Sequence, residues 1–243
     1  MEPSELFLPH RYPGPLLKGR FISRPNRFVA EVELEQGSIK THVPDPGRLR
    51  ELLHPGAEVY ICGPAPYPRK TPYTLLLVRA SCPPYPLVSL DTQAANRLAE
   101  QILRHPRLSP FGTPWQVRRE VKIGRSRLDF YLRQNRREIF LEVKSVSLVI
   151  DQVALFPDAP TLRGVRHLRE LMGLTRQGKQ AAVLFVAQRD DLMEIRPNEK
   201  TDPQFVRALK EAYRQGVRFF GFKFQITLEG YVYRGTAPIE MGA

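Results

Sequence analysis

A cluster of prolines divides this sequence into two parts with different patterns. Pro83, Pro84 and Pro86 fall within the six residues Ser81–Pro86. Proline fixes φ and has no backbone N–H to donate, so neither a helix nor a central strand continues through this segment. We therefore predict a domain boundary here, with one domain at residues 1–84 and a second at residues 85–243. A chain of 243 residues is long enough for two domains of ordinary size.

The first domain is predicted to be all-β. Its apolar runs are short and rich in strand formers, and apolar and polar residues roughly alternate in Phe28–Leu34, as they do in a half-buried strand. Five short strands with turns between them favour a small barrel. The segments that we assign to strands are Leu16–Ile22, Phe28–Leu34, Ala57–Cys62 and Tyr73–Ala80.

The second domain is predicted to be α/β with a mixed sheet. Leu162–Arg176 carries apolar residues at helical spacing after Thr161, a suitable N-cap. Ala181–Ala187 is apolar throughout, as a buried parallel strand is expected to be. Further helices are predicted at Asn96–Leu103 and Pro203–Gln215, and further strands at Gln116–Ile123, Arg127–Arg133, Glu138–Ser147, Val217–Thr227 and Tyr231–Arg234.

The charge of the chain points to a polyanionic partner. Lysine and arginine total 37 against 25 aspartates and glutamates, a formal net charge of +12, which favours nucleic acid over other partners. No apolar run is long enough to span a membrane, and the acidic, proline-broken start does not resemble a secretory signal. With only two cysteines, we expect a cytoplasmic protein without a disulfide scaffold or structural zinc.

Two carboxylates and a lysine stand on neighbouring predicted strands. A hairpin centred on Asn135 and Arg136 places Asp129 directly opposite Glu142, and Lys144 shares the face of Glu142 because side chains alternate along a strand. Opposed carboxylates repel each other, and a divalent cation offsets that repulsion. Mg²⁺ prefers oxygen ligands and also takes waters and phosphate oxygens, with Mn²⁺ as an alternative ion. The pattern therefore favours a phosphodiesterase site.

Two other interpretations of these residues stay open. One is that Glu120-Val121-Lys122, which repeats the sequence motif of Glu142-Val143-Lys144, supplies the second acid. If Gly124–Ser126 forms a three-residue loop, Val121 lies opposite Asp129 and Glu120 points away, which favours Glu142 as the second acid. The other interpretation is a purely structural ion pair between Glu142 and Lys144.

These residues resemble the PD-(D/E)XK nuclease superfamily, and more narrowly the sugar fermentation stimulation protein A family. The long block from Phe156 to Met172 is the most specific part of the resemblance. The other segments that carry it are Arg27-Phe28, Val43–Gly47, Asn96-Arg97-Leu98, Ser126–Phe130 and Leu141–Leu148. Within Val43–Gly47, the family usually has Cys-Pro-Asn-Thr-Gly, so Asp45 replaces a neutral residue and is expected to repel a phosphate.

The resemblance implies an N-terminal OB-fold-like barrel followed by a PD-(D/E)XK nuclease-like α/β domain. It also implies a bacterial or archaeal DNA-binding protein, linked by name to the use of sugars. The metal-binding acid of the superfamily corresponds to Asp129, its second acid to Glu142 and its lysine to Lys144. Superfamily members often add a glutamate from the first helix, and Glu100 is the candidate for a third metal ligand. Asp158 either reaches the metal or caps the helix that follows it, and we favour the cap.

We expect the DNA contacts to be made mainly with the phosphate backbone. The predicted contact residues are Arg27, Arg125, Arg127, Arg163 and His167, of which the last two share one face of a helix. Base stacking by aromatic residues of the barrel is an alternative to core packing, and we expect core packing for most of them. These aromatic residues are Tyr12, Phe21, Phe28, Tyr60 and Tyr73.

The sequence leaves more than one function open. The first hypothesis is a Mg²⁺-dependent deoxyribonuclease of the PD-(D/E)XK type that acts through Asp129, Glu142 and Lys144. The alternative is a non-catalytic DNA-binding transcriptional regulator of sugar metabolism that retains a nuclease fold. RNA is a further candidate substrate, because OB folds accept both polymers. No membrane partner is expected, and the oligomeric state is open, a dimer included.

Overall fold

The N-terminal part of the chain forms a closed five-stranded barrel in the computed structural model, which describes residues 7–8, 12–65, 70–112, 115–124 and 126–242. Its strands are β2 (Leu16–Asn26), β3 (Val29–Leu34), β4 (Gly37–His42), β5 (Glu58–Cys62) and β6 (Tyr73–Arg79). Parallel pairing of β4 with β6 closes the barrel around a core that includes Val32, Val59 and Leu75. The predicted barrel is confirmed. The strand left unassigned is β4, where Ile39 is the only large apolar side chain.

The C-terminal part is built on a mixed sheet, as predicted. Its central strand β13 (Gln180–Ala187) runs parallel to β10 (Arg137–Val146) and β15 (Arg218–Ile226). Antiparallel strands extend the sheet on both sides: β8 (Gln116–Ile123), β9 (Ser126–Gln134) and β16 (Tyr231–Ala237). All of β13 except its first residue is buried, because helices cover both faces of the sheet.

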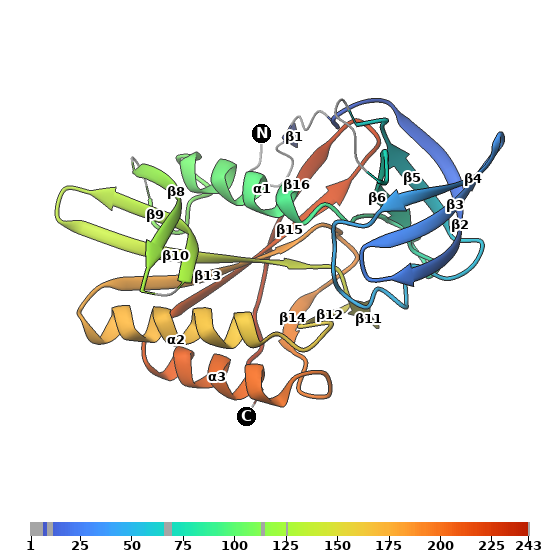
Figure 1. Cartoon of the computed structure of the whole chain (residues 1–243). Coiled ribbons are helices and arrows are strands. Elements are labelled where there is room, and N and C mark those ends of the chain that lie inside the picture. The colour runs from blue at the N-terminus through green and yellow to red at the C-terminus, as the bar shows by residue number, and fades with distance from the viewer. Residues whose placement is uncertain (1–6, 9–11, 66–69, 113–114, 125, 243) are drawn as a thin grey trace.

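Three helices cover this sheet (Figure 1). Helix α1 (Thr92–Arg104) lies on one face, and α2 (Leu162–Arg176) and α3 (Pro203–Arg214) lie on the other. The side chain of Thr161 caps α2 by accepting the N–H of Gly164, as predicted from the sequence. Asp158 does not cap this helix, which corrects the expectation for that residue. None of the helices in the described ranges is long and apolar enough to cross a bilayer.

Short strands join the barrel to the α/β part. β7 (Leu87–Ser89) pairs with β6 of the barrel and with β15, so one 13-stranded sheet runs through both parts of the molecule. β1 (Phe7–Leu8) pairs with β16. A separate small sheet contains β11 (Val149–Ile150), β12 (Val153–Phe156) and β14 (Glu194–Pro197). After β12 the chain continues into the segment that precedes α2, and this segment lies beside the barrel.

The two hairpins around Asp129 differ in how well the sequence predicted them. The β9–β10 ladder runs from Gln134↔Arg137 to Phe130↔Leu141 in the predicted register, and it ends there, before the predicted pair of Asp129 and Glu142. In the β8–β9 ladder, however, Ile123 pairs with Ser126 and Val121 with Leu128. The expected three-residue loop is therefore wrong, because Gly124 adopts a φ of +54° that permits a tighter turn. In this register Glu120, rather than Val121, lies across from Asp129.

Candidate active site

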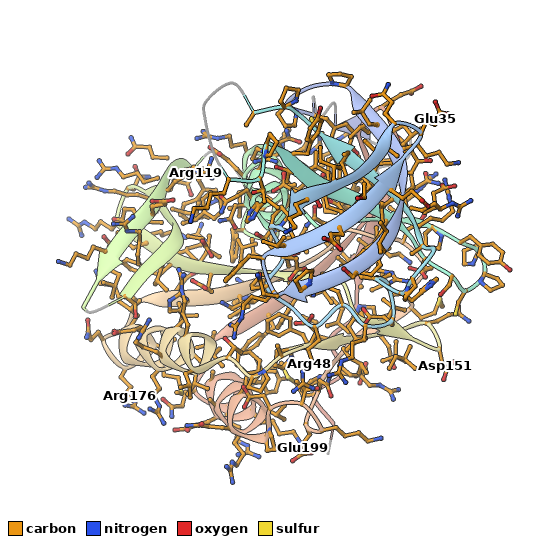
Figure 2. All side chains as sticks on the ribbon, turned by 45° about the vertical axis from the view of Figure 1, so that its right-hand side comes forward. Glu35, Arg48, Arg119, Asp151, Arg176 and Glu199 are labelled. Carbon is orange, nitrogen blue, oxygen red and sulfur yellow. The ribbon has the colours of Figure 1, made fainter. Side chains whose placement is uncertain are left out.

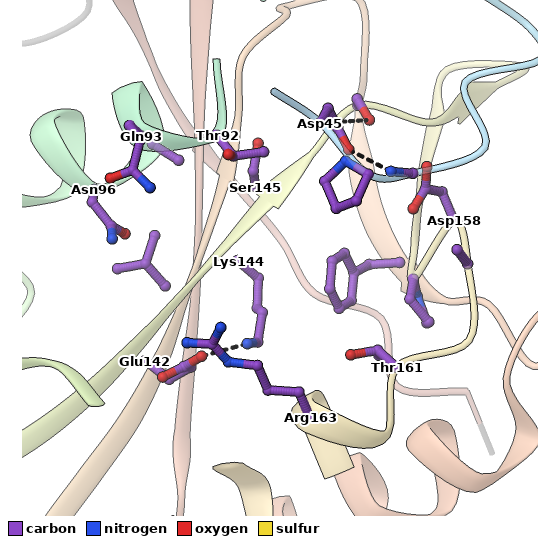
Figure 3. A pocket seen from close by; sticks show the side chains of 18 of the residues that line it. Asp45, Thr92, Gln93, Asn96, Glu142, Lys144, Ser145, Asp158, Thr161 and Arg163 are labelled. Carbon is purple, nitrogen blue, oxygen red and sulfur yellow. Dashed lines mark hydrogen bonds and ion pairs between the residues drawn. The ribbon is translucent and has the colours of Figure 1, made fainter. Parts of the chain in front are cut away.

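A pocket of about 390 Å³ lies where the barrel meets the α/β part of the chain (Figure 3). It is bounded by the barrel turn at Asp45–Gly47, the start of α1, the strands β9 and β10, and the segment that precedes α2. Among the residues that line it are Arg27, Asp45, Asn96, Asp129, Glu142, Lys144, Asp158 and Arg163. Chain segments distant in sequence thus bring carboxylates, one lysine and two arginines to a single concave site.

The regular β9–β10 ladder ends at Phe130, and beyond it the side chain of Asp129 bonds to the backbone of β10. Its Oδ2 accepts the backbone N–H of Val143 at 2.7 Å, and its Oδ1 accepts Nδ2 of Asn96 on α1 at 3.0 Å. Burial and the negative charge of Glu142 raise the pKa of this carboxyl, against the effect of the two hydrogen bonds. Asp129 is therefore held rigidly at the α1 side of the pocket.

Glu142 lies on β10 and is only 3% exposed. Its Oε1 accepts hydrogen bonds from Nζ of Lys144, at 2.5 Å, and from Nδ1 of His167 on α2. Its Oε2 is buried and has no hydrogen-bond partner among the described residues. Burial works to raise the pKa of Glu142, but the charge of Lys144 and the hydrogen bond from His167 outweigh it and lower the pKa.

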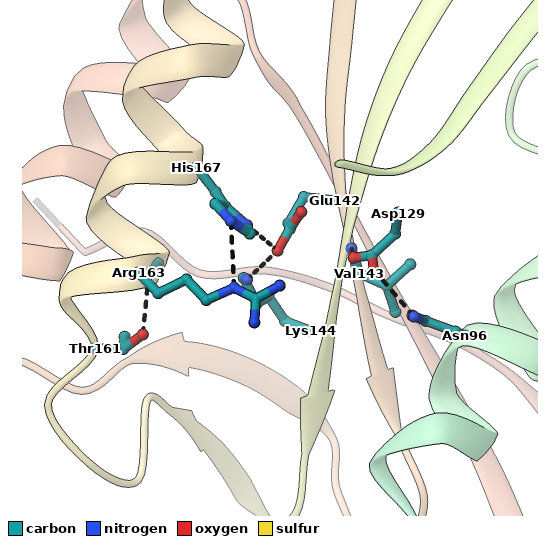
Figure 4. A network of polar contacts seen from close by, with 9 residues as sticks. Asn96, Asp129, Glu142, Val143, Lys144, Thr161, Arg163 and His167 are labelled. Atoms are coloured by element: carbon teal, nitrogen blue, oxygen red, sulfur yellow. Dashed lines mark hydrogen bonds and ion pairs between the residues drawn. The ribbon is translucent and has the colours of Figure 1, made fainter. Parts of the chain in front are cut away.

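The two acids approach one pocket from different sides (Figure 4). The side chain of Asp129 is bonded to α1 and that of Glu142 to α2, so the two carboxylates lie on different sides of β10. Both nevertheless line the same pocket. No group of three or more His, Cys, Asp or Glu side chains with the spacing of a metal site occurs in the described ranges. Two carboxylates, one with an unpartnered buried oxygen, fit Mg²⁺, which is usually held by one or two carboxylates together with waters and phosphate.

The structure does not bring Glu100 to this pocket. Its side chain pairs with Arg104 at 2.8 Å and with Arg119 at 3.5 Å, and Glu100 is not among the lining residues. Asn96, one helical turn earlier, contacts Asp129 instead. The expected third acid is therefore replaced by an amide. The spacing of the helix could have identified Asn96 from the sequence. Asn96 is four residues before Glu100, and residues four apart lie on the same helix face.

His167 is 2% exposed, which contradicts the prediction that it contacts DNA. Its Nδ1 bonds to Glu142, while Nε2 faces Nε of Arg163 at 3.4 Å. The hydrogen-bond network thus assigns a ring that donates from Nδ1 and accepts at Nε2. His167 positions Glu142, and Arg163 is the residue of this pair that lines the pocket.

The other predicted DNA contacts fall in different places. Arg27 is exposed and lines the pocket from the barrel. Arg127 is exposed and pairs with Glu120 at 3.0 Å, away from the lining residues. Glu120 has a φ of +53° and a side chain 61% exposed, so it does not enter the pocket although it lies across from Asp129. Arg125 lies outside the described residues.

The barrel side of the pocket carries a pair of carboxylates that the sequence did not place together. Asp45 is 7% exposed, and burial, followed by the negative charge of Asp158, raises its pKa to about 6. A Cβ on Gly47 would lie 1.9 Å from Oδ2 of Asp158, so this close approach requires glycine. Arg24 holds the turn by donating to the carbonyl oxygens of Arg27, Asp45, Gly47 and Arg48.

Comparisons with known proteins agree with this architecture. The profile described as the SfsA N-terminal OB domain matches residues 22–85, and that of the sugar fermentation stimulation protein RE domain matches residues 93–230. A sugar fermentation stimulation protein homolog from Moorella thermoacetica is 44% identical over 217 residues, which are 88% of this chain and 92% of that protein. A homolog from Desulforamulus reducens is 39% identical over 226 residues, 93% of each chain.

A solved structure extends the match to three dimensions. SfsA from Pyrococcus furiosus superimposes with a TM-score of 0.85 at 31% sequence identity, over 96% of this chain and 99% of that one. The sequence relatives and the structural relative carry the same family name. The chain therefore belongs to the sugar fermentation stimulation protein (SfsA) family, with the OB domain of that family as its barrel.

Proposed function

We propose that this protein binds DNA and hydrolyses its phosphodiester bonds with a divalent cation held by Asp129 and Glu142. The observation that carries the proposal is the Oε2 atom of Glu142, which is buried and has no hydrogen-bond partner among the described residues. A buried acceptor without a partner is costly, so such an atom calls for a ligand. Asp129 lines the same pocket and supplies the second carboxylate.

A relative that binds a divalent cation supports the proposal. SfsA from Pyrococcus furiosus was solved in complex with Ca²⁺. Ca²⁺ and Mg²⁺ are both hard cations that take oxygen ligands. We propose Mg²⁺ for this chain, with Mn²⁺ as a substitute. When bound, the cation would neutralise phosphate charge and lower the pKa of a bound water.

The surrounding side chains have distinct roles in the proposal. Lys144 is 14% exposed and places a positive charge beside Glu142, where it stabilises charge that develops on the phosphate oxygens. Arg163 lines the pocket and suits bidentate contact with phosphate. Asn96 and His167 orient the two carboxylates through the hydrogen bonds described above.

The partner is proposed from charge. A formal net charge of +12 favours a polyanion, and binding through the phosphate backbone should weaken steeply with salt. Competition between DNA and single-stranded RNA of the same length for binding to the protein tests whether DNA is the preferred polymer.

The test is cleavage of plasmid and branched DNA by purified protein with Mg²⁺ or Mn²⁺. Asp129→Ala and Glu142→Gln should abolish cleavage, and EDTA should do the same to the wild type. Glu120→Gln is a matched control, because Glu120-Val121-Lys122 repeats the Glu-x-Lys spelling outside the pocket. Cleavage that is equal in wild type and Asp129→Ala would overturn the proposal. Tight DNA binding without any metal-dependent cleavage would also overturn it.

A further inference from the structure

A groove on the barrel adjoins the candidate active site. It has a volume of about 560 Å³ and lies between the barrel and the segment that precedes α2. The residues Arg27, Pro46, Gly47, Ala159 and Pro160 line both this groove and the active-site pocket, so the two hollows share a wall. We call it the barrel groove; Arg24, Asn26, Arg48 and Arg50 complete its lining. The barrel groove therefore lies beside the pocket that Asp129 and Glu142 line.

Positive charge gathers in the barrel groove, and the charge of Asp158 offsets only part of it. Arg24 is engaged with four backbone carbonyl oxygens. Arg27, Arg48 and Arg50 are exposed, and none of them forms an ion pair with a carboxylate of the described residues. Arg48 lies between the barrel strands and the helices in Figure 2. Three exposed guanidinium groups along one groove suit a row of phosphates.

An exposed aromatic ring lies next to Arg27, at the end of the barrel groove's lining. Phe28 is 49% exposed, which corrects the expectation that it packs in the core. Its backbone is held by two hydrogen bonds: its N–H donates to Oδ1 of Asn26, and its carbonyl oxygen accepts the N–H of Val43, both at 2.9 Å. The guanidinium of Arg27 lies 5.9 Å from the ring centroid. The barrel therefore presents an exposed ring, on a hydrogen-bonded backbone, next to one of the arginines of the barrel groove.

We infer that the barrel groove binds an unpaired segment of single-stranded DNA, with a base stacked on Phe28 and its phosphates on Arg27, Arg48 and Arg50. The inference rests on the proposed function, which it deepens by naming the form of the substrate. Bases within a duplex are already covered by their neighbours, so a side-chain ring stacks on unpaired bases. A ring beside a basic groove is the usual arrangement of proteins that bind single strands.

The experiment is fluorescence anisotropy in EDTA, with labelled oligo(dT) and a labelled hairpin duplex of equal nucleotide number. The wild type should bind oligo(dT) more tightly than the duplex. Phe28→Ala should weaken oligo(dT) binding about tenfold and leave duplex binding unchanged. Phe28→Trp should retain it. Arg48→Gln and Arg50→Gln should each reduce the salt slope of log K by about one.

Matched controls lie on α3, away from the barrel. Tyr213→Ala removes a ring that is 59% exposed, and Arg207→Gln removes an exposed arginine; both should bind as the wild type does. Equal wild-type affinity for duplex and oligo(dT), or unchanged oligo(dT) binding by Phe28→Ala, would overturn the inference. Because no metal is present, these results are independent of cleavage. Loss of cleavage in Asp129→Ala bears on the proposed function alone, and loss of binding in Phe28→Ala bears on the barrel groove alone.

Discussion

His167 on α2 donates from Nδ1 to Oε1 of Glu142 on β10, and both side chains are almost fully buried. The contact joins two elements 25 residues apart in the chain and holds the carboxylate in one orientation. Lys144 reaches the same oxygen, so Oε2 is left as the free acceptor of this group. One oxygen of the Glu142 carboxylate is therefore anchored, and the other can accept a bond from a ligand.

Removal of the His167 ring should therefore destabilise the fold as well as the site. We expect His167→Ala to lower the free energy of unfolding by about 2 kcal/mol, because a hydrogen bond to a buried charged group is lost. His167→Gln, which keeps a donor, should lose less. The measurement is urea denaturation. His54→Ala, on an exposed barrel turn, should change stability by less than about 0.5 kcal/mol. Equal stabilities for His167→Ala and His54→Ala would refute the anchoring role.

Substitutions at Asn96 and at Glu100 should differ in their effect on cation binding. Asn96→Ala removes a hydrogen bond that favours the ionised form of Asp129, so it should raise the pKa of that carboxyl further and weaken Mg²⁺ or Mn²⁺ binding roughly 10- to 100-fold. Glu100→Gln should leave the affinity unchanged, because its side chain pairs with arginines outside the pocket. Calorimetric titration measures both. A larger loss in Glu100→Gln than in Asn96→Ala would restore Glu100 as the third ligand.

Lys144 should separate cation binding from cleavage. Its ammonium group shares Glu142 with the proposed cation and repels it. At a pH high enough to keep Glu142 ionised, Lys144→Ala is therefore expected to bind Mg²⁺ at least as tightly as the wild type, yet to lose cleavage, since no charge remains to stabilise the phosphate. Titration and a cleavage assay on one protein preparation test this. Weaker cation binding in Lys144→Ala, with its fold intact by circular dichroism, would contradict the assignment.

Asp45 predicts a specific dependence of stability on pH. Its pKa is raised from 3.8 to about 6 by burial and by Asp158, while Arg24 acts in the opposite direction. The folded state therefore binds the proton of Asp45 more tightly than the unfolded state does. The contribution of this proton to the free energy of unfolding is full below about pH 4 and is lost as the pH rises through 6. Asp45→Asn should match the wild type near pH 4 and exceed it at pH 7 by up to about 3 kcal/mol.

Urea denaturation between pH 4 and pH 8 measures this difference. Glu35→Gln, on the exposed barrel surface, is the control and should follow the wild type at every pH. A constant offset between Asp45→Asn and the wild type across the whole range would show that Asp45 does not titrate in this window.

Much of the fold was predictable because local patterns determine it. Alternation in Phe28–Leu34, the apolar run Ala181–Ala187 and the N-cap Thr161 each specify one element, and each is confirmed. The β9–β10 register was also predictable, since the turn at Asn135 sets it. The β8–β9 register was not, because a single residue more or less in the loop at Gly124 moves every later pair.

The sequence by itself determined that Asp129, Glu142 and Lys144 lie on one hairpin, because strand pairing depends on neighbours in the chain. Only the tertiary structure decided that Asn96 rather than Glu100 meets Asp129, and that His167 faces inwards to Glu142. It also decided that Phe28 remains exposed beside the arginines of the barrel groove. These outcomes depend on how α1, α2 and the barrel pack against the sheet. Such contacts join residues far apart in the chain, and no local pattern encodes them.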